Sequence, residues 1–128
     1  MSVLKANRKP SPFEVEHHAY KVRTVITDLA LRQFGLMVHE IFLANEISPQ
    51  FISECDERRI HQDLALGHCE NLIQELQYII TTLPVNIEKY ENITNMIIQE
   101  QALIKGWRKS DNKIRKSILN REKESVKA

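Results

Sequence analysis

The stretch SECDERRIHQDLALGHCENLIQELQYIITTLP, residues 53–84, decides the fold of this chain. Its apolar residues recur every three or four positions, which is the period of an amphipathic α-helix. Ser53 is a candidate N-cap with two acidic residues in the following turn, and Pro84 ends the pattern. The predicted core-facing stripe consists of Ile60, Leu64, Leu72, Leu76, Ile79 and Leu83, widened by Cys69, Ile73 and Ile80.

Two helices are predicted on the N-terminal side of this stretch. Ser11-Pro12 is typical of a helix start, and Gly35 is a plausible left-handed residue at a helix end. The first helix is therefore expected over 12–34 and a short second one over 36–47, stopped by Ser48-Pro49. Their apolar faces consist of Phe13, Tyr20, Val22, Val25, Ile26, Leu29 and Phe34, then Met37, Val38, Ile41, Phe42 and Ala44.

A fourth helix is predicted after Val85-Asn86, ending at about Arg121. Gly106 lies inside it, at a cost of roughly 1 kcal/mol relative to alanine, and marks either close packing or a kink. Residues 122–128 are expected to fray. The apolar stripe consists of Tyr90, Ile93, Ile97, Ile104 and Trp107, with Ile98 and Leu103 beside it and Ile114 and Ile118 extending it.

These patterns predict an all-α protein, an antiparallel four-helix bundle over 12–121 with a basic extended arm at 1–11. Short connections and the lack of strand signals favour this architecture. The chain has 128 residues, which suits one domain. It contains no run of 18 apolar residues and no apolar signal-peptide core at its start, so a cytoplasmic protein is expected.

The net charge of +1 hides a strong segregation along the chain. Residues 1–9 carry three basic side chains and no acidic one, and residues 10–104 carry six basic and fourteen acidic ones. Residues 105–128 carry nine basic and three acidic side chains. Such asymmetry suggests an anionic partner for the basic ends, although a solvated terminal helix would look the same.

No catalytic, cofactor or metal site is expected from the spacing of the reactive side chains. Cys55 and Cys69 would lie about 21 Å apart on one helix, too far for a disulfide, and are interpreted as reduced thiols. His61 and His68 are one heptad apart and cannot chelate one ion alone. The chain also lacks a P-loop and a dinucleotide-binding glycine motif. We therefore expect no enzymatic activity.

The strongest constellation is the basic segment LIKGWRKSDNKIRK, residues 103–116. Such a cluster gives phosphate affinity without sequence specificity. Trp107 could stack on a base, but its place in the stripe favours packing in the core or against another subunit. Asp111 interrupts the cluster. The candidate RNA- or partner-binding residues are Lys5, Arg8, Lys9, Lys105, Trp107, Arg108, Lys109, Lys113, Arg115 and Lys116.

A second charged group, Glu57, Arg58 and Arg59, begins the central helix. Arginine is unfavourable near a helix start. An intrahelical or intersubunit ion pair is the preferred interpretation, and an RNA contact is the alternative.

Three motifs, MSVLKANRK (1–9), LANEISP (43–49) and LIKGWRKSDNK (103–113), resemble a family of small four-helix-bundle proteins from bacterial and phage mobile elements. The family includes the accessory variability determinant (Avd) proteins of diversity-generating retroelements and the bundle proteins of 23S ribosomal RNA intervening sequences. The resemblance spans nearly the whole chain. The acidic central body departs from the family, whose members are strongly basic overall.

The resemblance implies a non-enzymatic accessory subunit that assembles into a homopentameric barrel. It would bind the reverse transcriptase and its template RNA and support mutagenic cDNA synthesis. The arm residues and Lys105, Arg108, Lys109 and Lys113 would contact RNA or polymerase. The alternative is a protein-interaction bundle of a mobile-element complex that binds no nucleic acid.

Overall fold

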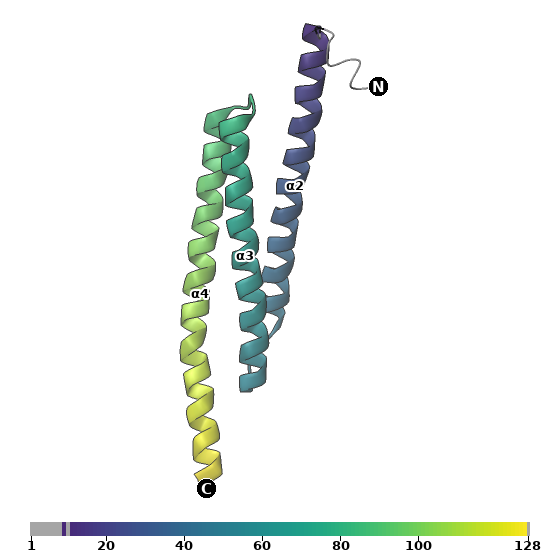
Figure 1. Cartoon of the computed structure of the whole chain (residues 1–128). Coiled ribbons are helices and arrows are strands. Elements are labelled where there is room, and N and C mark those ends of the chain that lie inside the picture. Colours follow the sequence, from purple (N-terminus) through teal and green to yellow (C-terminus); the bar gives the residue numbers. More distant parts are fainter. Residues whose placement is uncertain (1–8, 10, 128) are drawn as a thin grey trace.

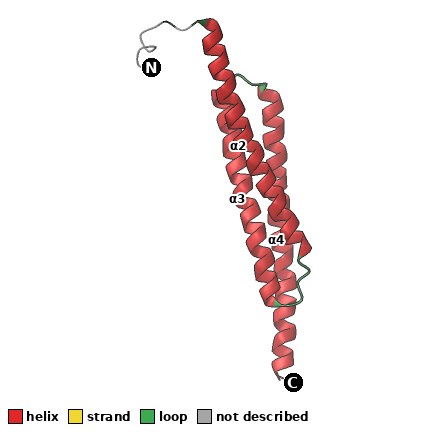
Figure 2. Ribbon diagram, turned by 90° about the vertical axis from the view of Figure 1, so that its right-hand side faces the viewer, coloured by secondary structure: helices red, strands yellow, loops and turns green. Residues whose placement is uncertain are grey.

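The computed structural model describes residues 9 and 11–127, and within them the protein is all-α. The described helices are α2 (Pro12–Glu46), α3 (Ile52–Thr82) and α4 (Ile87–Lys127). Consecutive helices run antiparallel and are joined by two short loops at opposite ends (Figures 1 and 2). None of the helices in this part of the chain is long and apolar enough to cross a membrane.

The predicted helix boundary at Gly35 is wrong, because α2 continues through it to Glu46. Gly35 does not adopt a positive φ, so it makes no left-handed helix end. A glycine inside a helix costs about 1 kcal/mol, which is too little to break a helix that packs on both sides of it. Here Ala30 and Met37, before and after the glycine, both belong to the buried core.

Most other helix ends follow from local capping chemistry. The Ser11 hydroxyl accepts a hydrogen bond from the Glu14 amide at 3.2 Å, as predicted. At the start of α3 the expected cap Ser53 is wrong, because Glu54 instead accepts the Gln50 and Phe51 amides at 2.9 and 3.1 Å. The expected end near Arg121 is also wrong: α4 extends to Lys127, so 122–127 are helical.

The core lies along α3, which packs against both other helices. No Cα atom of the described part of α2 lies within 8 Å of one in α4, so the arrangement is a single layer of three helices with α3 in the middle. Ile79 and Cys69 are fully buried at its centre. The buried cluster comprises Ala30, Met37, Ala65, Cys69, Leu72, Ile73, Leu76, Ile79, Ile97 and Ile104.

Many residues predicted to face the core are exposed instead. In the predicted α3 stripe, Ile60 is 57% exposed and Leu64 is 46% exposed. Gln62 and Ala65 of the same helix are buried instead. A single layer covers only one or two faces of each helix, which leaves other apolar faces open. The exposed residues predicted as core are Phe13, Tyr20, Val25, Leu29, Phe34, Val38, Phe42, Ile60, Leu64, Ile98, Leu103 and Ile114.

Gly106 lies in the unbroken helix α4 with open space around it. A Cβ built at this position meets no atom within 4 Å, so the structure shows no close packing. We expect Gly106→Ala to raise the free energy of unfolding by about 0.5–1 kcal/mol, because alanine restricts the unfolded chain and favours helix. Urea unfolding followed by circular dichroism measures this gain. A loss of stability would show that the glycine contacts something beyond this chain.

Candidate nucleic-acid interface on α4

A ladder of polar contacts joins α3 to the C-terminal half of α4. Its four rungs are Glu70–Gln101 (3.2 Å), Asp63–Arg108 (2.7 Å), Arg59–Asn112 (2.9 Å) and Asp56–Arg115. From Glu70 to Asp56 the rungs on α3 are seven, four and three residues apart. From Gln101 to Arg115 the rungs on α4 have the same spacing, in the opposite chain direction. The two helices therefore keep one antiparallel register through the whole ladder.

Asp111 is the centre of the polar contacts within this ladder. Its Oδ2 accepts a hydrogen bond from Gln62 Nε2 at 2.8 Å, and it lies 3.0 Å from Arg58 Nε as an ion pair. The same Arg58 donates to the Ile47 carbonyl at 3.1 Å, and its guanidinium lies 4.8 Å from the centre of the Trp107 ring. Both charged side chains are more than four-fifths buried.

Three expectations from the sequence change with this geometry. Arg58 pairs with Asp111 of another helix in the same chain, rather than within its own helix. Trp107 is half-buried beneath Arg58, which occupies one face of its ring. Arg108, a candidate RNA-binding residue, turns toward α3 and pairs with Asp63.

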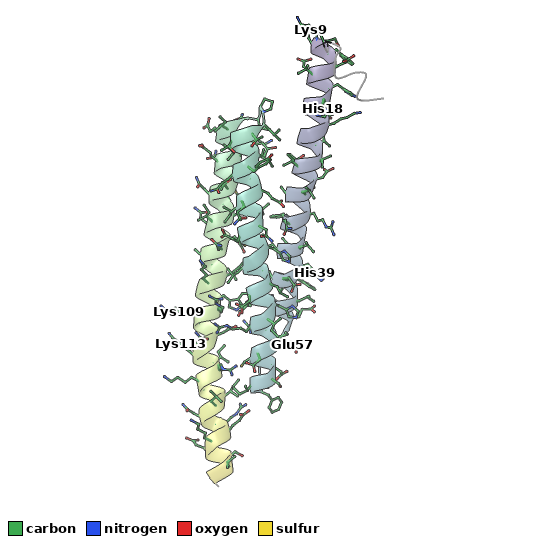
Figure 3. The ribbon with its side chains drawn as sticks, in the orientation of Figure 1. Lys9, His18, His39, Glu57, Lys109 and Lys113 are labelled. Carbon is green, nitrogen blue, oxygen red and sulfur yellow. The ribbon has the colours of Figure 1, made fainter. Side chains whose placement is uncertain are left out.

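The lysines of the segment occupy a different face of α4. At about 100° per residue, Lys105, Lys109, Lys113 and Lys116 fall within an arc of about 80°, and Lys123 falls in the same arc. All five are exposed, and none forms an ion pair with another residue that the structure describes. We call these five residues the lysine row. Figure 3 shows Lys109 and Lys113 pointing away from α3.

The lysine row is straight and uniform in charge. From Lys105 to Lys123 it extends about 27 Å along the helix axis. The two acidic residues between them, Asp111 and Glu122, lie by helical spacing on the side of α4 that faces α3. Between Lys105 and Lys123, a polyanion lying along this face would meet no acidic residue.

Lys9, the described basic residue of the N-terminal arm, lies far from the lysine row. Lys9 is exposed beside the start of α2, at the end of the molecule opposite to Lys109 and Lys113 (Figure 3). Lys5 and Arg8 lie outside the described residues. One chain thus does not bring Lys9 and the lysine row onto one surface.

Neither cysteine is an activated nucleophile. Burial raises the pKa of the Cys69 thiol to about 11, and the nearby Glu100 and Glu70 act in the same direction. Burial also raises the pKa of Cys55, against the opposing effect of Arg115. Both thiols are therefore protonated at neutral pH, and a protonated thiol is a poor nucleophile.

The two central histidines contact α2 instead of forming a metal site. His61 Nδ1 lies 2.6 Å from Glu40 Oε2, and His68 Nδ1 lies 3.0 Å from Gln33 Oε1. Within residues 9 and 11–127, no three His, Cys, Asp or Glu side chains are grouped so that they could hold a metal ion. Both histidines of α3 thus make polar contacts with side chains of α2.

Sequence reasoning missed the partners of the arginines. The partners of arginines in the ladder, Asp56, Asp63 and Asn112, were not among the candidates. These partners could have been predicted from the sequence, because opposite charges recur at equal spacing on two helices that are joined by a short loop.

Comparison with protein-family models, curated proteins and solved structures finds no match to this chain.

Proposed function

We propose that this protein is a non-enzymatic, cytoplasmic accessory subunit of a diversity-generating retroelement. In this proposal it assembles with copies of itself, binds the template RNA through α4, and binds the reverse transcriptase. The RNA part depends on the geometry of α4. The retroelement and the polymerase depend on the motif resemblance.

The observation that carries the proposal is the separation of arginines from lysines on α4. Arg108 and Arg115 are neutralised by Asp63 and Asp56, whereas no lysine of the lysine row forms an ion pair with a described residue. Lysine acts as a flexible point charge, suited to phosphate contact without reading bases. With one face of Trp107 occupied by Arg58, backbone contact is favoured over base stacking.

The test is the variant Lys105→Ala/Lys109→Ala/Lys113→Ala/Lys116→Ala. We expect its RNA affinity to fall at least about tenfold near 0.1 M salt. The slope of log K against log salt should become less steep by about three, because four phosphate contacts are lost. Fluorescence anisotropy with a labelled RNA, measured over a series of salt concentrations, gives both quantities.

A matched pair of double variants separates the lysine row from net charge. Lys109→Ala/Lys113→Ala removes two charges from the row, whereas Arg32→Ala/Lys89→Ala removes two exposed charges from elsewhere. Only the first should change the salt dependence. Equal losses in both would mean that RNA responds to total charge, and an unchanged quadruple variant would contradict the proposal.

Self-assembly and the polymerase partner need separate measurements. The resemblance implies five copies, and light scattering at micromolar concentration gives the mass directly; a monomer would contradict self-assembly. Co-purification with a reverse transcriptase of a diversity-generating retroelement would support this part of the proposal. A chain that assembles but binds no RNA would instead favour the protein-interaction bundle.

A further inference from the structure

Helices α2 and α3 separate toward the N-terminal end of α2 and leave a groove between them. The buried residues of α2 are Ala30, Met37 and Ala44, and none of its described residues before Ala30 is buried. Figure 1 shows α2 leaning away from α3 over the same stretch. The groove in this opening has a volume of about 460 Å³, which suits a small ligand. Its lining includes Ile26, Leu29, Gln33, Gln74, Glu75 and Tyr78.

Glu75 is the charged side chain of this groove, and the described residues leave its charge without compensation. Its Oε2 atom is enclosed by the protein and has no hydrogen-bond partner among them. The carboxylate also forms no ion pair with any of them. Two neighbouring amides have other partners. Gln33 Oε1 lies 3.0 Å from His68 Nδ1. Gln74 Nε2 donates to Glu70 Oε1 at 3.4 Å.

A carboxylate in this position favours a ligand that carries positive charge. Burial raises the pKa of the Glu75 carboxyl, because the ionised form loses hydration that no donor replaces. A cation in the groove would stabilise the ionised form. The surrounding body of the chain, with fourteen acidic and six basic side chains in residues 10–104, also attracts cations.

The lining of the groove discriminates among cations. Divalent metal ions need several oxygen ligands, and the described part of the chain has no group of three acidic, His or Cys side chains that could hold one. A guanidinium group binds a carboxylate best through both oxygens, but Oε2 of Glu75 is enclosed. An ammonium group acts as a point charge and needs only one oxygen, which Oε1 can supply. Ile26 and Leu29 offer an apolar wall to methylene groups, and the half-exposed Tyr78 offers an aromatic ring to the cation.

We propose that this groove binds a primary alkylammonium group. The ammonium contacts the Glu75 carboxylate beside the Tyr78 ring, and the alkyl chain lies against Ile26 and Leu29. Free aliphatic diamines carry this group, and so do the lysine side chains of a second copy of the chain. The inference goes beyond the proposed function, because the groove lies between α2 and α3 and the lysine row lies on α4.

Titration of the full chain with cadaverine, a diamine with a five-carbon chain, tests the site through the methyl NMR signals of Ile26 and Leu29. These signals should shift saturably with a dissociation constant on the order of 1 mM, an ordinary affinity for a ligand of so few atoms. The methyl signal of the buried Ile118, in the C-terminal part of α4, should not move. The diol of the same chain length has no charge and should not bind. Equal shifts with the diol would overturn the proposal, and this comparison needs no variant.

Matched variants test the role of each side chain. Glu75→Gln keeps the size of the side chain but removes its charge, so cadaverine should bind at least about tenfold more weakly. Glu57→Gln removes an exposed charge near the opposite end of α3 (Figure 3) and should leave the affinity unchanged. Tyr78→Leu should weaken binding about two- to fivefold, whereas Tyr78→Phe keeps the ring and should not. Equal affinities of Glu75→Gln and wild type would contradict the assigned contact.

The mass in solution identifies the source of the ammonium group. If a lysine of a second copy fills the groove, Glu75→Gln should lower the mass measured by light scattering, and cadaverine should lower the mass of the wild-type chain. If a free amine fills it, neither change should alter the mass. Both results support the site, provided that the methyl signals shift.

Two outcomes separate this inference from the proposed function. The variant without the four lysines should still bind cadaverine, so a loss of its RNA affinity alone would leave the groove supported. A chain that binds RNA but shows no saturable shift of Ile26 with cadaverine would overturn the groove and leave the proposed function standing.

Discussion

Asp111→Ala is expected to lower the free energy of unfolding by about 2–4 kcal/mol. The change removes the anion that lies 3.0 Å from Arg58 Nε and the acceptor of the Gln62 side-chain amide. Arg58 would then remain as a largely buried cation with no carboxylate, and Gln62, which is 1% exposed, would lose its acceptor. Urea unfolding of the variant measures the cost.

Two further variants define the origin of that cost. Asp111→Asn keeps an acceptor for Gln62 but removes the charge, so it should fall between wild type and Asp111→Ala. Arg58→Leu/Asp111→Leu removes both charges at once and should cost less than Asp111→Ala alone, because no unpaired charge is left. If Asp111→Ala cost less than about 0.5 kcal/mol, the Arg58–Asp111 pair would stabilise the fold no more than an exposed ion pair does.

Ile79→Ala is expected to cost about 2–5 kcal/mol, because it leaves a cavity where the core is fully closed. Ile79 is fully buried on α3, the helix that both other helices contact. The cavity would therefore weaken the packing of the central helix itself. Thermal and urea unfolding give the loss.

The matched controls are Ile79→Val and Ile60→Ala. Removing one methyl group should cost about 0.5–1.5 kcal/mol. Ile60 is on the same helix but 57% exposed, so its truncation should cost much less. Equal losses at Ile60 and Ile79 would indicate that Ile60 is covered by another molecule.

The sequence predicted the helical class and the two prolines that end helices, because these features depend on local chemistry. Ser11 and Asn86, for example, accept the backbone hydrogen bonds expected at helix starts. Gly35 was misjudged because the packing of α2 on α3 outweighs the helix propensity of one residue. Four of the five lysines in the lysine row were among the candidates, because the exposure of a lysine does not depend on the position of a neighbouring helix.

The pattern of α4 alone could not predict that its arginine side chains turn toward α3. Arg108 and Lys109 are adjacent in the sequence, yet one pairs with Asp63 and the other faces outward (Figure 3). The difference arises from the register between α3 and α4, which only the fold defines. The apolar residues of α2 present the same difficulty, because periodicity shows that a face is apolar and not which helix covers it.

The single-layer arrangement has a consequence for how the chain folds. Both helix pairs in contact are joined by loops of a few residues, 47–51 and 83–86, and α2 and α4 make no close backbone contact over the described residues. Over the described residues, each helix thus packs only on the helix next to it in the sequence, and each helical hairpin begins at a short loop whose closure costs little entropy. Such a topology can form as two successive helical hairpins that share α3, without bringing the two ends of the chain together.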